Sequence, residues 1–133
     1  MSGWIGVDLD GTLAMYDGWK GPALIGEPVP EMLFRVKKWL ADGHTVKIFT
    51  ARVSFPDVPI IGKSKEAAEA LGRKIEADIA REAIRLWCKE HIGVELEITN
   101  VKDYGMIELW DDRAVQVEPN TGRPIGTSTR GLA

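Results

Sequence analysis

The stretch that decides the fold is Trp4-Ile5-Gly6-Val7-Asp8-Leu9-Asp10-Gly11-Thr12-Leu13. It is a short apolar run that ends in two carboxylates two residues apart, followed by a glycine and a hydroxyl. Such a run is typical of a parallel strand buried on both faces, and α/β proteins bind ligands outside the carboxyl ends of these strands. Two acids this close repel each other, and burying them without a countercharge is costly. The stretch therefore indicates a central strand with a divalent cation at its end.

Composition places the chain among soluble globular proteins of one domain. It has 133 residues, of which 44% are hydrophobic and 28% charged, and this excludes a disordered or membrane chain. The N-terminus lacks the features of a signal peptide, so we expect a cytoplasmic protein without a membrane partner. The net charge of −3 does not favour nucleic acid as a partner, although a local basic groove could still bind it. Cys88 is the single cysteine, and we expect it to be a buried small hydrophobe.

Hydrophobic periodicity divides the chain into alternating strands and helices. It predicts helices over residues 29–41 and 64–91, and strands over 45–50, 94–98, 106–110 and 115–117. The first strand, the first helix and the second strand make a βαβ unit, which brings Thr50 close to Asp8. Residues 1–118 form a single domain in this interpretation, and 119–133 form a tail that could be mobile. Residues 14–30 and 53–62 are loops.

Two parts of this layout stay open. An unbroken helix over 64–91 is about 40 Å long, whereas a domain of this size has a radius of gyration of about 14 Å. We expect the helix to break near Gly72; otherwise it projects and packs against another subunit of a homodimer. Its apolar stripe consists of Ala68, Leu71, Ile75, Ile79, Ala83, Leu86 and Trp87. Seven residues separate Ile98 from Met106, too few for a helical crossover. The connection is then an extended return, or one strand is short, displaced or antiparallel.

Residues able to do chemistry follow several of the predicted strands. They are Asp8 with Asp10, Thr50, Lys102, and Asp111 with Asp112. Mg²⁺ takes about six oxygen ligands, and Asp8, the main-chain carbonyl of Asp10 and a carboxylate of Asp111 or Asp112 could supply the protein's share. Tyr16 and Trp19 either stack on a substrate or, as we favour, attach their loop to the protein. Arg52 either binds a second anionic group or forms a structural salt bridge.

These motifs, in this order, resemble those of the haloacid dehalogenase superfamily, over roughly residues 4–117. The resemblance implies a three-layer α/β/α Rossmann-like domain with a mainly parallel sheet and no cap domain. It implies that Asp8 is the nucleophile and Asp10 the general acid/base, that Thr50 and Lys102 bind the phosphoryl group, and that Asp111 and Asp112 serve the metal site. We expect further substrate contacts from Leu9, Gly11, Thr12, Tyr16, Trp19, Ala51 and Arg52.

The expected function is magnesium-dependent hydrolysis of a nucleotide or another small phosphomonoester through an aspartyl-phosphate. The chain has no room for a cap domain, because one loop and one helix fill the interval between Asp10 and Thr50. Two alternatives stay open. One is a phosphate- or metal-binding module without turnover, and the other is a phosphatase of nucleic-acid 3′ ends, against which the net acidity counts.

Overall fold

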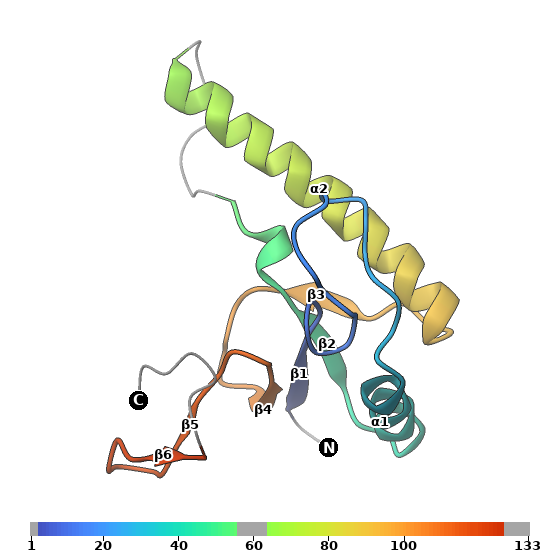
Figure 1. Ribbon diagram of the computed structural model, residues 1–133, viewed down its shortest axis with the longest axis vertical. Helices are drawn as coiled ribbons and strands as arrows, with labels where there is room; N and C mark the ends of the chain where they lie inside the picture. Colours follow the sequence, from blue (N-terminus) through green and yellow to red (C-terminus); the bar gives the residue numbers. More distant parts are fainter. Residues whose placement is uncertain (1–2, 56–63, 127–133) are drawn as a thin grey trace.

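The structure is a computed structural model that describes residues 3–55 and 64–126. Four strands form its main sheet: β1 (Trp4–Asp8), β2 (Val46–Phe49), β3 (Glu97–Thr99) and β4 (Met106–Trp110). All neighbours in this sheet are parallel and the order is β3-β2-β1-β4 (Figure 1). Two helices, α1 (Pro30–Ala41) and α2 (Lys65–His91), and a 3-10 turn, η1 (Ala51–Val53), accompany the sheet. The predicted α/β class with a mainly parallel sheet is confirmed.

The sheet has one face covered by both helices. Side chains of β1 alternate between the faces, so Ile5 and Val7 lie on the covered face beside their register partners Val46 and Ile48 in β2. Five side chains from the helices join this core: Met32 and Val36 of α1, and Ile84, Trp87 and Cys88 of α2. Cys88 is buried as expected, and burial raises the pKa of its thiol to about 11.

The other face of the sheet has no helix over it among the described residues. Trp4 is buried there beneath Lys47, whose ammonium lies 4.6 Å from the centroid of the indole ring. Ile107 and Leu109 of β4 are 52% and 36% exposed. The expected third layer is therefore not confirmed in the described part of the chain.

The connection from β3 to β4 explains this one-sided arrangement. Residues 100–105 carry the chain back from the carboxyl end of β3 to the start of β4 without a helix. Trp4 holds the end of this return: its main-chain N–H donates to the carbonyl of Gly105 (2.7 Å), and its indole N–H donates to Asp103 (2.8 Å). Two of the alternatives left open by the sequence are observed together: the return has no helix, and β3 is short and displaced toward its C-terminal end; neither strand is antiparallel in this sheet.

The predicted break near Gly72 is wrong, because α2 is a single helix of 27 residues. The Ser64 side chain caps it by accepting a hydrogen bond from the main-chain N–H of Ala67 (3.1 Å). The argument for a break assumed that the whole helix must lie within the domain. Instead, its C-terminal half packs on the sheet and its N-terminal half extends past the sheet, at the top of Figure 1.

The apolar stripe that indicates α2 in the sequence is also not the face that packs. The buried residues of the helix are mostly small: Ala67, Ala70, Ala77, Ala80, Ile84, Trp87 and Cys88. Of the stripe, only Trp87 is buried, whereas Leu71, Ile75, Ile79 and Leu86 are each 43–52% exposed. Small side chains let the helix lie close to the protein, so the larger residues face outward.

The remaining elements differ from expectation mainly in their bounds. The strand expected over 94–98 is β3 (Glu97–Thr99), and the one expected over 115–117 is β5 (Gln116–Val117). β5 pairs antiparallel with β6 (Pro124–Ile125), so the predicted boundary after residue 118 falls inside a hairpin. Most of the predicted loop 53–62 and the last seven residues of the tail lie outside the described residues. Within the described chain, no helix combines the length and the apolar character needed to cross a membrane.

Gly72 offers a test of the unbroken helix. A Cβ added at Gly72 meets no atom within 4 Å, so Gly72→Ala should raise the free energy of unfolding by about 0.4–1 kcal/mol. A Cβ at Gly6 in β1 comes within 3.1 Å of Met106 and of Trp4, so Gly6→Ala should lower it. Urea denaturation followed by circular dichroism measures both. Destabilisation by Gly72→Ala would show that this position is not in an ordinary helix.

Candidate active site

The site begins in the turn after β1. Leu9 is fully buried, which leaves Asp8 and Asp10 on either side of it directed away from the core. The main-chain N–H of Ala14 closes the turn on the carbonyl of Leu9 (2.8 Å). Gly11 has a φ of +86°, and a Cβ there would lie 2.6 Å from a carboxylate oxygen of Asp112. Glycine at this position therefore allows the segment after β4 to lie against the turn.

Three carboxylates gather because β1 and β4 are neighbours that end at the same edge. Ligand oxygens of Asp8, Asp111 and Asp112 all lie within 4.8 Å of one another. Thr12 joins this acidic cluster: its hydroxyl lies 3.4 Å from carboxylate oxygens of both Asp8 and Asp112, and it accepts the main-chain N–H of Asp112 (3.0 Å). Three carboxylates on two adjacent strand ends are a donor set that suits Mg²⁺ or Ca²⁺.

The environment of Asp8 raises its pKa to about 8. Burial is the largest cause, followed by a hydrogen bond with Asp112 and by the negative charges of Asp111, Asp112 and Asp10. A carboxylate in this position needs either a proton or a cation. In the metal-free chain the proton supplies that balance near neutral pH.

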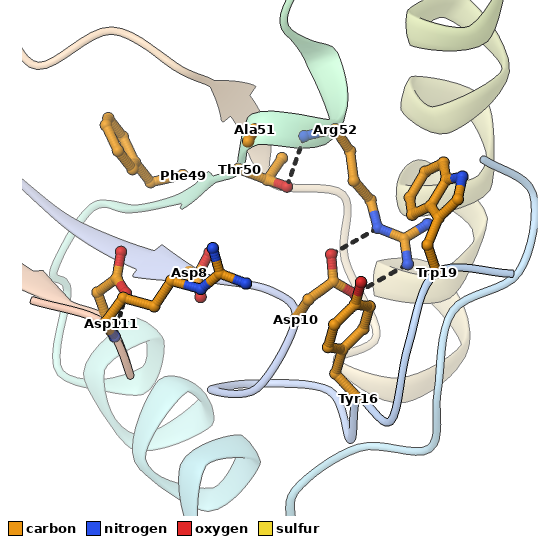
Figure 2. A pocket seen from close by; sticks show the side chains of 10 residues that line it. Asp8, Asp10, Tyr16, Trp19, Phe49, Thr50, Ala51, Arg52 and Asp111 are labelled. Atoms are coloured by element: carbon orange, nitrogen blue, oxygen red, sulfur yellow. Dashed lines mark hydrogen bonds and ion pairs between the residues drawn. The ribbon is translucent and has the colours of Figure 1, made fainter. Parts of the chain in front are cut away.

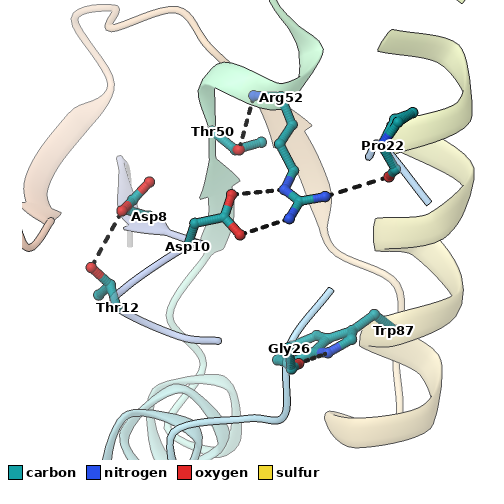
Figure 3. A network of polar contacts seen from close by, with 8 residues as sticks. All are labelled: Asp8, Asp10, Thr12, Pro22, Gly26, Thr50, Arg52 and Trp87. Atoms are coloured by element: carbon teal, nitrogen blue, oxygen red, sulfur yellow. Dashed lines mark hydrogen bonds and ion pairs between the residues drawn. The ribbon is translucent and has the colours of Figure 1, made fainter. Parts of the chain in front are cut away.

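Asp10 is balanced in a different way, by Arg52. The guanidinium contacts both carboxylate oxygens, with Nε 2.7 Å from one and Nη2 2.8 Å from the other (Figure 3). The Arg52 side chain is only 4% exposed, and its guanidinium lies 4.9 Å from the ring centroid of Trp19. The main-chain N–H of Arg52 donates to the Thr50 hydroxyl (3.1 Å). Arg52 thus forms the salt bridge of the second interpretation, and the contact of the first, with an anionic ligand, stays a prediction.

A cavity of about 300 Å³ opens above these groups (Figure 2). Its lining consists of Asp8, Asp10, Tyr16, Trp19, Phe49, Thr50, Ala51, Arg52, Asp111 and Arg113. Eight of these ten residues were predicted as site residues. Phe49 and Arg113 were missed, although both stand next to predicted residues, at the end of β2 and directly after the two acids of β4.

Lys102 does not line this cavity. It lies in the return between β3 and β4 and faces a separate cavity lined also by Glu108, Leu109 and Asp111. Leu9, Gly11, Thr12 and Asp112 are likewise not among the lining residues; Asp112 belongs to the acidic cluster, and Gly11 and Thr12 lie against its carboxylate. The Arg113 guanidinium, by contrast, reaches the cavity and has no ion-pair partner among residues 3–55 and 64–126.

The loop over the cavity is attached at several points. The main-chain N–H of Met15 donates to the carbonyl of Glu27 (2.8 Å), which closes the loop at its base. The indole of Trp87 in α2 donates to the carbonyl of Gly26 (3.0 Å), and Arg52 lies 3.4 Å from the carbonyl of Pro22 (Figure 3). Tyr16 and Trp19 line the cavity from this loop and are 41% and 54% exposed. They are thus available to a ligand even though Trp19 also packs on Arg52.

The raised pKa of Asp8 predicts how the stability of the metal-free protein depends on pH. An unfolded Asp loses its proton near 3.8, whereas the folded protein keeps it up to about 8. The folded state therefore binds more protons between these values, and the free energy of unfolding should fall as the pH rises through this window. Asp8→Asn should remove that part of the dependence and should be more stable than the wild type at pH 8.

Denaturant unfolding in EDTA from pH 4 to 9 measures this effect. Glu76→Gln, which removes an exposed carboxylate on α2, is the control for a general loss of negative charge. Parallel pH profiles for the wild type and Asp8→Asn would contradict the raised pKa. Added Mg²⁺ should reverse the loss of stability in the wild type only.

Comparisons with known proteins leave the site to be interpreted from its own geometry. No protein-family model matches the chain, no curated protein matches it in sequence, and no solved structure matches it in fold.

Proposed function

We propose that the chain is a magnesium-dependent phosphatase of the haloacid dehalogenase type, without a cap domain, that acts on small phosphomonoesters. The parallel sheet of this α/β protein is compatible with the Rossmann-like fold of that superfamily. One observation carries the proposal: Asp8, a member of the acidic cluster, lines the same cavity as the Arg52–Asp10 pair.

The acidic cluster provides the metal-binding part of this proposal. Asp8, Asp111 and Asp112 would hold Mg²⁺, together with the main-chain carbonyl of Asp10. The bound ion would supply positive charge for the phosphoryl oxygens and would take the place of the proton on Asp8. The Asp10 side chain is directed to Arg52 rather than to the cluster, which fits a role for its carbonyl alone in metal binding.

The chemistry runs in two steps that share Asp8 and Asp10. In the first, a carboxylate oxygen of Asp8 forms a bond to phosphorus, the bond from phosphorus to the leaving oxygen breaks, and Asp10 gives that oxygen a proton. In the second, Asp10 takes a proton from water, the water oxygen bonds to phosphorus, and the bond to Asp8 breaks. Inorganic phosphate leaves, and both carboxylates return to their starting states.

Arg52 adds a condition to the first step. In the described arrangement both oxygens of Asp10 accept hydrogen bonds from a guanidinium, which can only donate. Asp10 therefore has to give up this contact before it can serve as the acid. An anionic substrate that enters the cavity competes for Arg52 and so frees Asp10 to act as the acid.

The lining of the cavity favours a nucleotide or a molecule of similar shape. The exposed rings of Tyr16 and Trp19 offer planar surfaces for a base, and the guanidinium of Arg113 offers a contact for a phosphoryl group. At about 300 Å³ the cavity is at the small end of ligand sites. These features support a small substrate over a polymer.

The proposal predicts that Asp8→Asn abolishes magnesium-dependent hydrolysis of p-nitrophenyl phosphate, with kcat reduced at least about 10³-fold. Glu76→Gln should retain full activity, and EDTA should inactivate the wild type reversibly. A wild type that binds Mg²⁺ but hydrolyses no phosphomonoester would show instead a binding module without turnover. Hydrolysis of oligonucleotide 3′-phosphates in preference to mononucleotides would favour the end-processing alternative.

A second prediction concerns which cation binds the phosphoryl group. Because Arg113 lines the cavity and Lys102 does not, Arg113→Ala should lower kcat/KM about 10²-fold or more, as for the loss of one charged transition-state donor. Lys102→Ala should have a much smaller effect. Steady-state kinetics on the two variants decide between them. The opposite order would mean that Lys102 moves into the cavity in the substrate complex.

A further inference from the structure

The outer face of α2 carries an apolar stripe that no described segment covers. We define this outer stripe as Ala68, Leu71, Ile75, Ile79, Ala83 and Leu86. The four large residues among them are 43–52% exposed. The spacing of three or four residues aligns them along the helix for about 27 Å, opposite the buried alanine face. A continuous apolar surface of this kind marks a contact site more often than it marks ordinary solvent-exposed surface.

The stripe is symmetric in a way that matches a second copy of itself. Ala68 and Leu86, Leu71 and Ala83, and Ile75 and Ile79 are three pairs whose members lie equally far before and after Ala77. If two α2 helices run antiparallel through their stripes and cross at the level of Ala77, the members of each pair lie at the same level along the contact. Alanine then faces leucine at both ends, and isoleucine faces isoleucine in the middle. In a twofold-symmetric interface the same surface of each copy must fit the other, and the outer stripe meets this requirement.

We propose that α2 pairs antiparallel with α2 of a second copy of this chain, centred on Ala77, to form a homodimer. Charges beside the stripe fit the same arrangement. Lys65 and Glu90 lie on one flank of the stripe and are nearly symmetric about Ala77. In the antiparallel pair, Lys65 of one copy therefore lies close to Glu90 of the other copy. A parallel pairing would instead place like charges together.

A groove beside the stripe accommodates the partner. A cavity of about 430 Å³ lies between the C-terminal half of α2 and residues 23–25, lined among others by Leu24, Ile79, Ala83 and Leu86. Leu24 is 59% exposed. In the antiparallel pair the N-terminal part of the partner's α2 lies over this groove, where the small side chain of the partner's Ala68 permits a close approach to Leu86.

The proposal also accounts for the unbroken helix. The N-terminal half of α2 extends past the sheet, while the C-terminal half is held on it (Figure 1). Antiparallel pairing rests each extended half on the anchored half of the other copy. The length of the helix, which is excessive for one domain of this size, is then the length that two copies need.

Analytical ultracentrifugation of the full chain over a concentration series tests the dimer. The wild type should sediment as two chains, and Ile75→Arg should weaken association at least about 30-fold, since it places two charges at the centre of the contact. Phe34→Arg, which replaces a 71% exposed aromatic residue on α1 outside the stripe, should leave the dimer intact. Circular dichroism verifies that both variants are folded. A monomeric wild type, or equal effects of both variants, would overturn the proposal.

Crosslinking then tests the antiparallel orientation. Chains carrying Ala68→Cys and chains carrying Leu86→Cys, distinguished by a tag, are mixed and oxidised; native Cys88 is buried and does not interfere. The antiparallel pair predicts disulfides between the two kinds of chain. Disulfides formed mainly between two Ala68→Cys chains would show a parallel pairing, and the proposed arrangement would then be wrong.

Discussion

The negative charge at the end of β1 is the constraint on which the rest of the site depends. Asp8 and Asp10 leave the sheet side by side, and Asp111 and Asp112 arrive beside them from β4. Each part of this charge is balanced separately. Arg52, almost fully buried, neutralises Asp10, and the burial and repulsion at Asp8 leave it with a proton or a cation. Because the two acids of one motif have different partners, they differ in charge balance, as the separate roles in the proposed function require.

Local sequence predicts the parts of this site that lie at strand ends, because parallel strands of one sheet end at one edge. That rule places Thr50 near Asp8 and both near Asp111, as observed. The rule does not apply to residues 100–105, because their sequence has no hydrophobic periodicity and predicts no strand end. The position of Lys102 depends on the hydrogen bond from Trp4 to Asp103, a contact between residues 99 positions apart. The same rule could have predicted Arg113 as a site residue, because Arg113 directly follows Asp111 and Asp112.

Helix α2 shows a second limit of periodicity. The pattern of large apolar residues predicts a helix correctly, but it does not say which face packs inward. Small side chains on the buried face of the helix let it lie close to its neighbours, and close approach buries area that bulkier side chains would prevent. The predicted break at Gly72 came from comparing the helix with the size of one domain. That comparison fails when the helix is longer than the sheet it crosses.

The attachment of the loop over the cavity has an entropic consequence. The hydrogen bond at Met15 holds the loop at its base, and the one at Gly26 holds the part that leads back to α1. The contact of Arg52 with Pro22 holds the middle of the loop. Gly26 permits this closure, because a Cβ there would lie 2.0 Å from the carbonyl oxygen of Met15. A ligand that stacks on Tyr16 or Trp19 therefore meets rings already ordered by the fold. The conformational entropy of the loop is lost during folding and not during binding, which leaves more of the contact energy for affinity.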